Sequence, residues 1–320
     1  MHGVAQARSN IALVKYWGKR DASENLPAVP SLSLTLDGLV TRTQVRFEPY
    51  PGDDVLILNG RSENGAARTR VQKFLDLVRA RAGLRGRAQV RSSNSFPTAA
   101  GLASSASAFA ALAAAAAHAA GLQLDSRELS ALARRGSGSA ARSVFGGFVE
   151  MDLEGFARPL LAPEAWDVRM VIALAGGEAK SIGSTDAMNA TADRSPYYGA
   201  WIESHAADMT RARRALASRD LATLGDLAES SCLKMHAAAM AAGIVYWNGT
   251  TVEVLRAVRG LRDRGAACWF TIDAGPHVKV LCAPPDADAV ETALAAIAGV
   301  TRTFMARPGA GVEILGGAAE

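Results

Sequence analysis

The chain has 320 residues, of which 49% are hydrophobic and 21% are charged, a composition typical of a soluble globular protein with one large or two medium domains. Its 35 basic and 31 acidic residues give a net charge of only +4 and form no basic tract, which disfavours a nucleic-acid-binding protein. The N-terminus does not resemble a signal peptide, no run suits a membrane span, and three cysteines without metal-ligand spacing are typical of a reducing compartment, so we expect a cytoplasmic protein.

The first predicted element is a strand that begins near residue 3 and leads into Lys15-Tyr-Trp-Gly-Lys19. Two cations and two aromatic donors within five residues suit an anionic ligand. A strand end with solvated lysines and core aromatics would show the same pattern. The segment alone therefore leaves both interpretations open.

Residues 31–48 predict a hairpin, because leucines alternate with Ser and Thr before an Asp37-Gly38 turn. A short strand is expected over 55–58. Apolar residues at helical spacing then predict a helix over 66–82.

A loop of small residues connects a predicted strand, 87–91, to an alanine-rich helix that Gly121 ends. The loop holds Gly101 and several hydroxyl groups. A loop of small residues leaves its backbone N–H groups accessible, and the first turn of a helix adds unpartnered N–H groups and a positive dipole end, so this stretch suits a phosphate. It is not a Walker A loop, because Gly-x-x-x-x-Gly-Lys-Ser/Thr does not occur. A helix start rich in capping serines is the alternative.

A capping box, Asp125-x-x-Glu128, predicts the next helix, and a turn with Ser137, Ser139 and Arg142 follows it. The turn superficially matches a dinucleotide fingerprint. We reject that match because the fingerprint must follow a strand and this turn follows a helix. Arginine suits a carboxylate or phosphate through two hydrogen bonds, whereas a capped helix end with a surface arginine is the alternative.

Strands are predicted within 143–174, and a polar run after Gly176-Gly177 suggests two domains, 1–178 and 179–320. The second domain should contain helices near 195–217, 220–240, 250–263 and 286–297 and strands at 267–272, 277–282, 300–306 and 311–315. Asp273 follows one of these strands in an Asp-Ala-Gly-Pro turn. Turn chemistry alone explains these residue types.

Four stretches together resemble the GHMP kinase superfamily and, within it, the diphosphomevalonate decarboxylase family. They are Lys15-Tyr-Trp-Gly-Lys-Arg-Asp, Asn94-Ser-Phe-Pro-Thr-Ala-Ala-Gly-Leu-Ala-Ser-Ser-Ala-Ser, Gly136-Ser-Gly-Ser-Ala-Ala-Arg-Ser-Val-Phe-Gly-Gly and Phe270-Thr-Ile-Asp-Ala-Gly-Pro. The resemblance runs from residue 10 to about 282. It implies an α+β, two-lobed GHMP kinase-like fold, with an N-terminal half of ribosomal-protein-S5 type, a ferredoxin-like C-terminal half, and the site between them.

The resemblance also implies a reaction. ATP would phosphorylate the 3-hydroxyl of mevalonate 5-diphosphate, and the 3-phosphate would then leave with carbon dioxide to give isopentenyl diphosphate, in the mevalonate route to isoprenoids. Mg²⁺ is expected as the counter-ion of ATP, with no protein ligand assigned to it. A homodimer is expected, with no nucleic-acid or membrane partner.

In the family, the catalytic positions correspond to Asp273, Lys15, Arg142 and Asn10. Asp273 would accept or aim the hydroxyl proton, Lys15 would stabilise charge, Arg142 would hold the substrate carboxylate, and Asn10 would orient Arg142. The remaining substrate-binding residues would be Tyr16, Lys19, Ser137, Ser139, Ser184 and Thr185. The ATP-binding residues, within the loop 94–107, would be Asn94, Pro97, Gly101, Leu102, Ala103, Ser104, Ser105 and Ser107.

The sequence departs from the family at Val29-Pro30, where polar Asn-Ser is usual near the substrate. This departure leaves the phosphorylation state of the substrate open. The alternatives are a decarboxylase of mevalonate 5-phosphate, a mevalonate 3-kinase, and a non-catalytic nucleotide-binding or regulatory module on the same fold. Asp273, Lys15 and Arg142 together disfavour the kinase, and the intact acidic, basic and loop groups disfavour the module.

Overall fold

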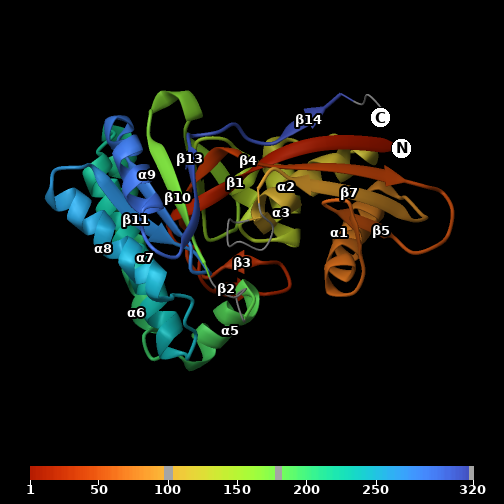
Figure 1. Cartoon of the computed structure of the whole chain (residues 1–320). Coiled ribbons are helices and arrows are strands. Elements are labelled where there is room, and N and C mark those ends of the chain that lie inside the picture. Colours follow the sequence, from red (N-terminus) through yellow and green to blue (C-terminus); the bar gives the residue numbers. More distant parts are fainter. Residues whose placement is uncertain (97–103, 177–181, 317–320) are drawn as a thin grey trace.

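Two long antiparallel strands, β1 (His2–Val14) and β4 (Ser31–Phe47), cross the N-terminal lobe in the computed structural model, which describes residues 1–96, 104–176 and 182–316 (Figure 1). The predicted hairpin at Asp37-Gly38 is wrong, because β4 continues through these residues as a bulge. Asn10 pairs with Thr35 and Arg8 with Val40, so β1 supplies a partner on both sides of the bulge. Gly38 takes a φ of +83°, which relieves the kink without reversing the chain.

Eight strands of the described chain form the first sheet, in the order β14-β1-β4-β7-β5-β6, with β8 paired to β4 and β9 to β8. The strands besides β1 and β4 are β5 (Val55–Leu58), β6 (Arg61–Glu63), β7 (Ala88–Asn94), β8 (Phe148–Met151), β9 (Ala157–Leu161) and β14 (Glu313–Leu315). The helices of this lobe are α1 (Ala66–Ala82), α2 (Ser104–Ala119), α3 (Ser126–Gly136) and α4 (Ala140–Ser143). The predictions of strand 55–58, helix 66–82 and the capping box on α3 are confirmed.

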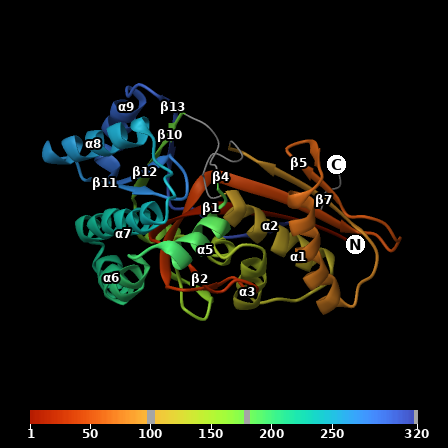
Figure 2. The same cartoon turned by 90° about the horizontal axis from the view of Figure 1, so that it is seen from below.

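Helix α2 packs closely on the first sheet because its residues are small (Figure 2). A Cβ on Gly3 of β1 would lie 2.3 Å from the backbone oxygen of Ala115, so only glycine permits this approach. Nearly the whole length of α2 is buried. This packing fixes the position of the N-terminal turn of α2 at Ser104.

The second sheet is antiparallel and has the order β11-β12-β10-β13. Its strands are β10 (Arg169–Ala175), β11 (Cys268–Ile272), β12 (Val278–Cys282) and β13 (Val300–Ala306), and the helices of this lobe are α5 (Ser184–Arg194), α6 (Tyr198–Ser218), α7 (Leu221–Ala241), α8 (Gly249–Asp263) and α9 (Ala287–Ala295). One face packs against α8 and α9, and the other shares a core with β1, β4, α6 and α7. Short 3₁₀ helices at Pro163–Ala165 and Pro284–Asp286 and the small hairpin β2 (Lys19–Asp21)–β3 (Leu26–Pro27) complete the elements.

Two strands pair with a sheet on the other side of residue 178, where the domain boundary stays a prediction. Strand β10 precedes that boundary but pairs with β12 and β13 of the second sheet. Strand β14 follows it but pairs with β1 of the first sheet. Helix α5 is an element that the sequence pattern did not predict. No described helix is long and apolar enough to cross a membrane.

Candidate active site

Residues of both lobes line a cleft of about 500 Å³. It brings together the predicted site residues Asn10, Lys15, Tyr16, Lys19, Ser104, Ser105, Ser137, Ser139, Arg142, Ser184, Thr185 and Asp273. Segments that are far apart in the sequence meet here: the end of β1, the start of α2, the α3–α4 turn, the start of α5 and the turn after β11.

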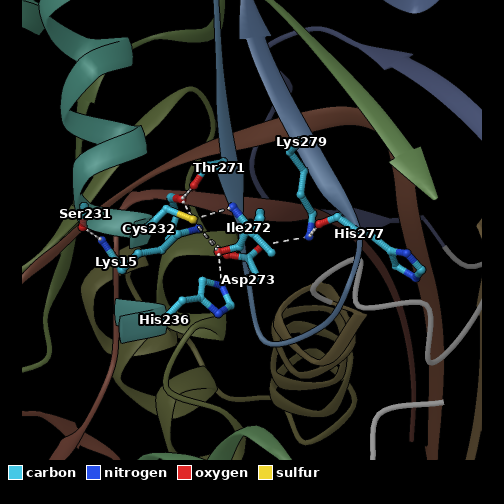
Figure 3. A network of polar contacts seen from close by, with 10 residues as sticks. Lys15, Ser231, Cys232, His236, Thr271, Ile272, Asp273, His277 and Lys279 are labelled. Atoms are coloured by element: carbon cyan, nitrogen blue, oxygen red, sulfur yellow. Dashed lines mark hydrogen bonds and ion pairs between the residues drawn. The ribbon is translucent and has the colours of Figure 1, made fainter. Parts of the chain in front are cut away.

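Lys15 and Asp273 form an ion pair at the junction of the two lobes (Figure 3). Lys15 Nζ lies 2.6 Å from Asp273 Oδ1 and also donates to the carbonyl oxygen of Ala12 at 2.8 Å. Lys15 is 1% exposed, whereas the side chain of Asp273 keeps 24% exposure. The carboxylate is therefore held from the protein side and is reachable from the cleft.

Lys279 of β12 is a second cation on the same carboxylate and was not among the predicted site residues. Its Nζ lies 3.2 Å from Asp273 Oδ2, and Figure 3 shows the two lysines approaching Asp273 from opposite sides. Burial alone would raise the pKa of Asp273, but the charges of Lys15 and Lys279 outweigh it and hold the pKa well below its usual range. A lysine between Val278 and Val280 in an apolar strand is the signal that could have revealed it.

The other titratable groups beside Asp273 are neutral at pH 7. Burial raises the pKa of Cys232 to about 11. Burial, together with the nearby charge of Lys15, lowers the pKa of His236 to about 3. Both side chains come from α7 and contact the backbone of Ile272, so they help to place the end of β11 (Figure 3).

Arg142 is a buried cation held by hydroxyl groups. It is 2% exposed, and its Nε and Nη1 donate to Ser33 Oγ at 3.0 Å and Ser31 Oγ at 2.7 Å. Burial lowers the pKa of Arg142 to about 10, which leaves it charged at pH 7. No carboxylate forms a salt bridge with it among the residues that the structure describes. A buried charge without a counter-ion at a cleft wall suits an anionic ligand.

Asn10 lies in the cleft but is bonded to other residues than predicted. Its Nδ2 donates to the carbonyl oxygen of Ser139 at 3.0 Å and to Ser143 Oγ at 2.7 Å. The side chain therefore braces the α3–α4 turn, while the serines of β4 orient Arg142. Its Oδ1 is buried and has no protein partner within the described chain.

The α3–α4 turn presents hydroxyl groups to the cleft. Ser137 Oγ lies 3.4 Å from Ser105 Oγ and 3.3 Å from Ser139 Oγ. A Cβ on Gly138 would lie 2.2 Å from the hydroxyl oxygen of Tyr16, so glycine is needed at this turn. Burial raises the pKa of Tyr16 to about 12, and its hydroxyl has no described protein partner, so it can donate to a ligand.

One end of the cleft is basic. Lys19 Nζ contacts Asn25 Oδ1 at 2.7 Å and Thr185 Oγ1 at 3.1 Å. Arg70 of α1 donates to the carbonyl oxygen of Gly136 at 2.7 Å, and both cations have pKa values lowered first by burial. Helix α5 begins at Ser184 and adds its positive end. Arg70 and Asn25 were not among the predicted site residues, and nothing in the sequence distinguishes Arg70 from the other arginines of α1.

Two described residues that were predicted to bind ATP, Ser107 and Asn94, do not line this cleft. Ser107 is fully buried, and its hydroxyl pairs with Thr41 Oγ1 at 2.7 Å and Ser9 Oγ at 3.2 Å. Asn94, at the end of β7, accepts from Thr41 Oγ1 at 2.7 Å. Val29 is 1% exposed and packs in the core, so this departure from the family does not line the cleft. Pro97, Gly101, Leu102 and Ala103 lie outside the described residues.

The cleft thus contains a carboxylate that two lysines hold, a buried arginine, a wall lined by hydroxyl groups and a basic end. In the described part of the chain, no group of three or more His, Cys, Asp or Glu side chains is placed to hold a metal ion. The arrangement suits a small substrate with anionic groups at two ends and a reacting hydroxyl between them.

Known proteins are similar to this chain over most of its length. A family model described as the diphosphomevalonate decarboxylase-like N-terminal domain matches residues 7–156, and the mevalonate 5-diphosphate decarboxylase C-terminal domain matches 170–307. A curated phosphomevalonate decarboxylase of Haloferax volcanii is 35% identical over 92% of each chain. The solved mevalonate diphosphate decarboxylase of Staphylococcus aureus is 36% identical, covers 98% of each chain and has a TM-score of 0.94. A solved complex of MDDEF with MVAPP, AMPPCP and magnesium is 39% identical, with 98% of this chain and 99% of that chain covered and a TM-score of 0.93.

Proposed function

This chain belongs to the diphosphomevalonate decarboxylase family, and from that premise we propose that it decarboxylates mevalonate 5-diphosphate to isopentenyl diphosphate with the consumption of ATP. One observation carries the proposal: the cleft has a basic end, at Lys19 and Arg70, that is distinct from the buried Arg142 and from the Lys15–Asp273 pair. These three features match the diphosphate, the carboxylate and the reacting hydroxyl of that substrate.

The substrate is held at both ends in this proposal. Lys19, Arg70 and the N-terminus of α5, with Ser184 and Thr185, bind the 5-diphosphate. Arg142 binds the carboxylate, and Tyr16, Ser137 and Ser139 donate hydrogen bonds between the two ends. Fixing both ends aligns the 3-hydroxyl with the phosphoryl group, which accounts for much of the acceleration of a phosphoryl transfer.

Asp273 aims the 3-hydroxyl and then accepts its proton. The two lysines make the carboxylate a weak base, so it acts first as a hydrogen-bond acceptor. The hydroxyl proton becomes far more acidic once the oxygen bonds to phosphorus, and Asp273 then takes it. The 3-phosphate departs with its C–O electron pair while the carboxylate leaves as carbon dioxide, and the electrons of the broken C–C bond form the double bond. Lys15 stabilises the charge on the transferring and departing phosphate.

ATP enters at the start of α2, where Ser104 and Ser105 line the cleft. Mg²⁺ in such sites is bound mainly by phosphate oxygens and water, with few protein ligands. The described residues fit that mode, because hydroxyl oxygens line this wall whereas both oxygens of Asp273 face lysines. When bound, the ion would neutralise the charge of the phosphates, and the Ser105 hydroxyl would be one of its ligands.

The expectations of two functional domains, a homodimer and a cytoplasmic location belong to this proposal. The two sheets support the division into lobes, with β10 assigned to the second. The dimer rests on the family resemblance, and the location rests on three cysteines without metal-ligand spacing. Light scattering of the purified protein tests the first of these, and cell fractionation tests the second.

A second candidate substrate is mevalonate 5-phosphate, favoured by the likeness to the Haloferax volcanii enzyme. The deciding experiment is carbon dioxide release with ATP and mevalonate, its 5-phosphate or its 5-diphosphate. We expect the highest kcat/KM with the 5-diphosphate, because two cations and a helix N-terminus meet at the basic end. A higher kcat/KM with the 5-phosphate than with the 5-diphosphate would make mevalonate 5-phosphate the substrate instead.

A further inference from the structure

Lys279 occupies a position where a protein core ordinarily has an apolar side chain. It lies on β12, the strand between β11 and β10, opposite Thr271 and Ile172. Val278 and Val280 pack in the core with α8 and α9, and Leu281 packs in the core on the other face. Lys279 is 1% exposed, so its ammonium group loses most of its hydration.

The charges around Asp273 do not balance. Lys15 and Lys279 contribute two positive charges and Asp273 one negative charge, which leaves a net charge of +1. Cys232 and His236 from α7 are neutral, and His277, beside Lys279, has a pKa lowered to about 4 by burial. Arg142 adds further positive charge from the other lobe. One lysine would suffice to neutralise the carboxylate, so the second needs another explanation.

Each lysine holds a different oxygen of the carboxylate. Lys15 contacts Oδ1 at 2.6 Å and Lys279 contacts Oδ2 at 3.2 Å, from opposite sides (Figure 3). The torsion that turns a carboxylate is broad, so one contact leaves it free to rotate. Two contacts on different oxygens fix its plane, and with it the direction in which it meets a ligand in the cleft.

We propose that Lys279 is a positioning residue for phosphoryl transfer, which holds Asp273 Oδ2 so that Oδ1 and the Lys15 ammonium keep one orientation toward the reacting hydroxyl. This inference rests on the proposed function. A misplacement of about 1 Å at a reacting group can cost about 10²-fold in rate. A purely structural ion pair would instead affect stability and leave turnover unchanged.

The test compares Lys279→Met with wild type. Methionine is unbranched, fills a similar volume and suits the apolar surroundings, and Lys15 still pairs with Asp273, so the substitution leaves no buried charge without a partner. We expect kcat to fall about 10- to 100-fold, while KM for ATP and for mevalonate 5-diphosphate changes less than about threefold and thermal stability is kept. Lys279→Gln, which restores a neutral donor, should recover part of kcat.

The pH profile supplies a readout that a structural role would not move. Loss of Lys279 raises the pKa of Asp273 toward its ordinary value, so the acid limb of kcat should move to higher pH. The matched control is Lys234→Met. It removes the lysine of another lysine–aspartate pair, Lys234–Asp208, which lies outside the cleft. It should leave kcat and the acid limb unchanged.

Carboxyl ¹³C NMR of aspartate-labelled protein separates this inference from the proposed function. The Asp273 resonance, assigned with Asp273→Asn, should titrate at higher pH in Lys279→Met, whether or not the protein turns over the substrate. An inactive wild type with this shift would refute the proposed function alone. If the wild type turns over the substrate and Lys279→Met keeps the same kcat and the same acid limb, the positioning role is wrong. An unchanged pH titration of Asp273 in Lys279→Met would also overturn it. If Lys279→Met does not fold, the same criteria apply to Lys279→Gln.

Discussion

Replacing Asp273 with asparagine tests both the chemistry and the electrostatics of the cleft. The substitution removes the negative charge that two buried lysines share. Positioned acid–base groups typically contribute about 10²–10⁴-fold, so kcat should fall by at least about 10²-fold, with ATP affinity little changed. On the sequence alone, where Asp273 is a turn residue near one lysine, the substitution is expected to leave thermal stability little changed.

The structure predicts a loss of stability as well. Breaking a buried ion pair from one side costs about 3–5 kcal/mol, and we take about 3 kcal/mol because the Asp273 side chain keeps 24% exposure. With an unfolding entropy of about 2.1 cal/mol/K per residue, this lowers the Tm of a 320-residue chain by about 4–5 °C. Calorimetry at pH 7 measures the shift.

The stability deficit of Asp273→Asn should shrink as pH rises. Burial already lowers the pKa of Lys279, and loss of the carboxylate lowers it further. Between this lowered pKa and the ordinary pKa of lysine, Lys279 has lost its proton in the folded variant but keeps it in the unfolded chain. The unfolded state then binds more protons, so the free energy of unfolding rises with pH in this window.

Asp208→Asn is the matched control for Asp273→Asn. Asp208 is also buried, but it pairs with Lys234, whose side chain is 31% exposed and can turn to water. The control should lose less stability and keep wild-type kcat. A folded Asp273→Asn enzyme within about tenfold of wild-type kcat would refute the catalytic assignment. A Tm loss no larger than that of Asp208→Asn would refute the electrostatic argument.

Three further substitutions test the separate parts of the cleft. Lys19→Ala should raise KM for mevalonate 5-diphosphate with kcat nearly kept, because the basic end is remote from the reacting carbon; steady-state kinetics showing an unchanged KM would remove Lys19 from the site. Arg142→Gln should lower kcat and weaken substrate binding about 10- to 100-fold with ATP affinity kept, since a charged hydrogen bond contributes about 1.5–3 kcal/mol; calorimetry showing lost ATP binding would reassign Arg142 to the phosphates. Ser105→Ala should weaken the use of ATP more than the binding of the substrate. Titration calorimetry with both ligands and steady-state kinetics test this, and unchanged ATP affinity with unchanged turnover would contradict it.

Local patterns in the sequence determined the elements whose stability is local. The helix over 66–82 follows from its apolar spacing, and the start of α3 follows from its capping box, because both signals depend on residues within one or two turns. The Asp37-Gly38 turn was predicted by the same kind of local signal and was wrong. A partner strand that pairs on both sides of those residues, Asn10 with Thr35 and Arg8 with Val40, decided between a hairpin and a bulge.

The motifs identified the family and the chemical types of the site residues, but tertiary structure decided their geometry. Lys15 and Asp273 are 258 residues apart, and no periodicity relates them. Lys279 and Arg70 carry no local signal of function, since a lysine in a strand and an arginine on a helix have many roles. Their charges matter only because folding removes them from water and places them around one cleft. Desolvation and proximity are properties of the packed chain, and therefore the tertiary structure alone determines them.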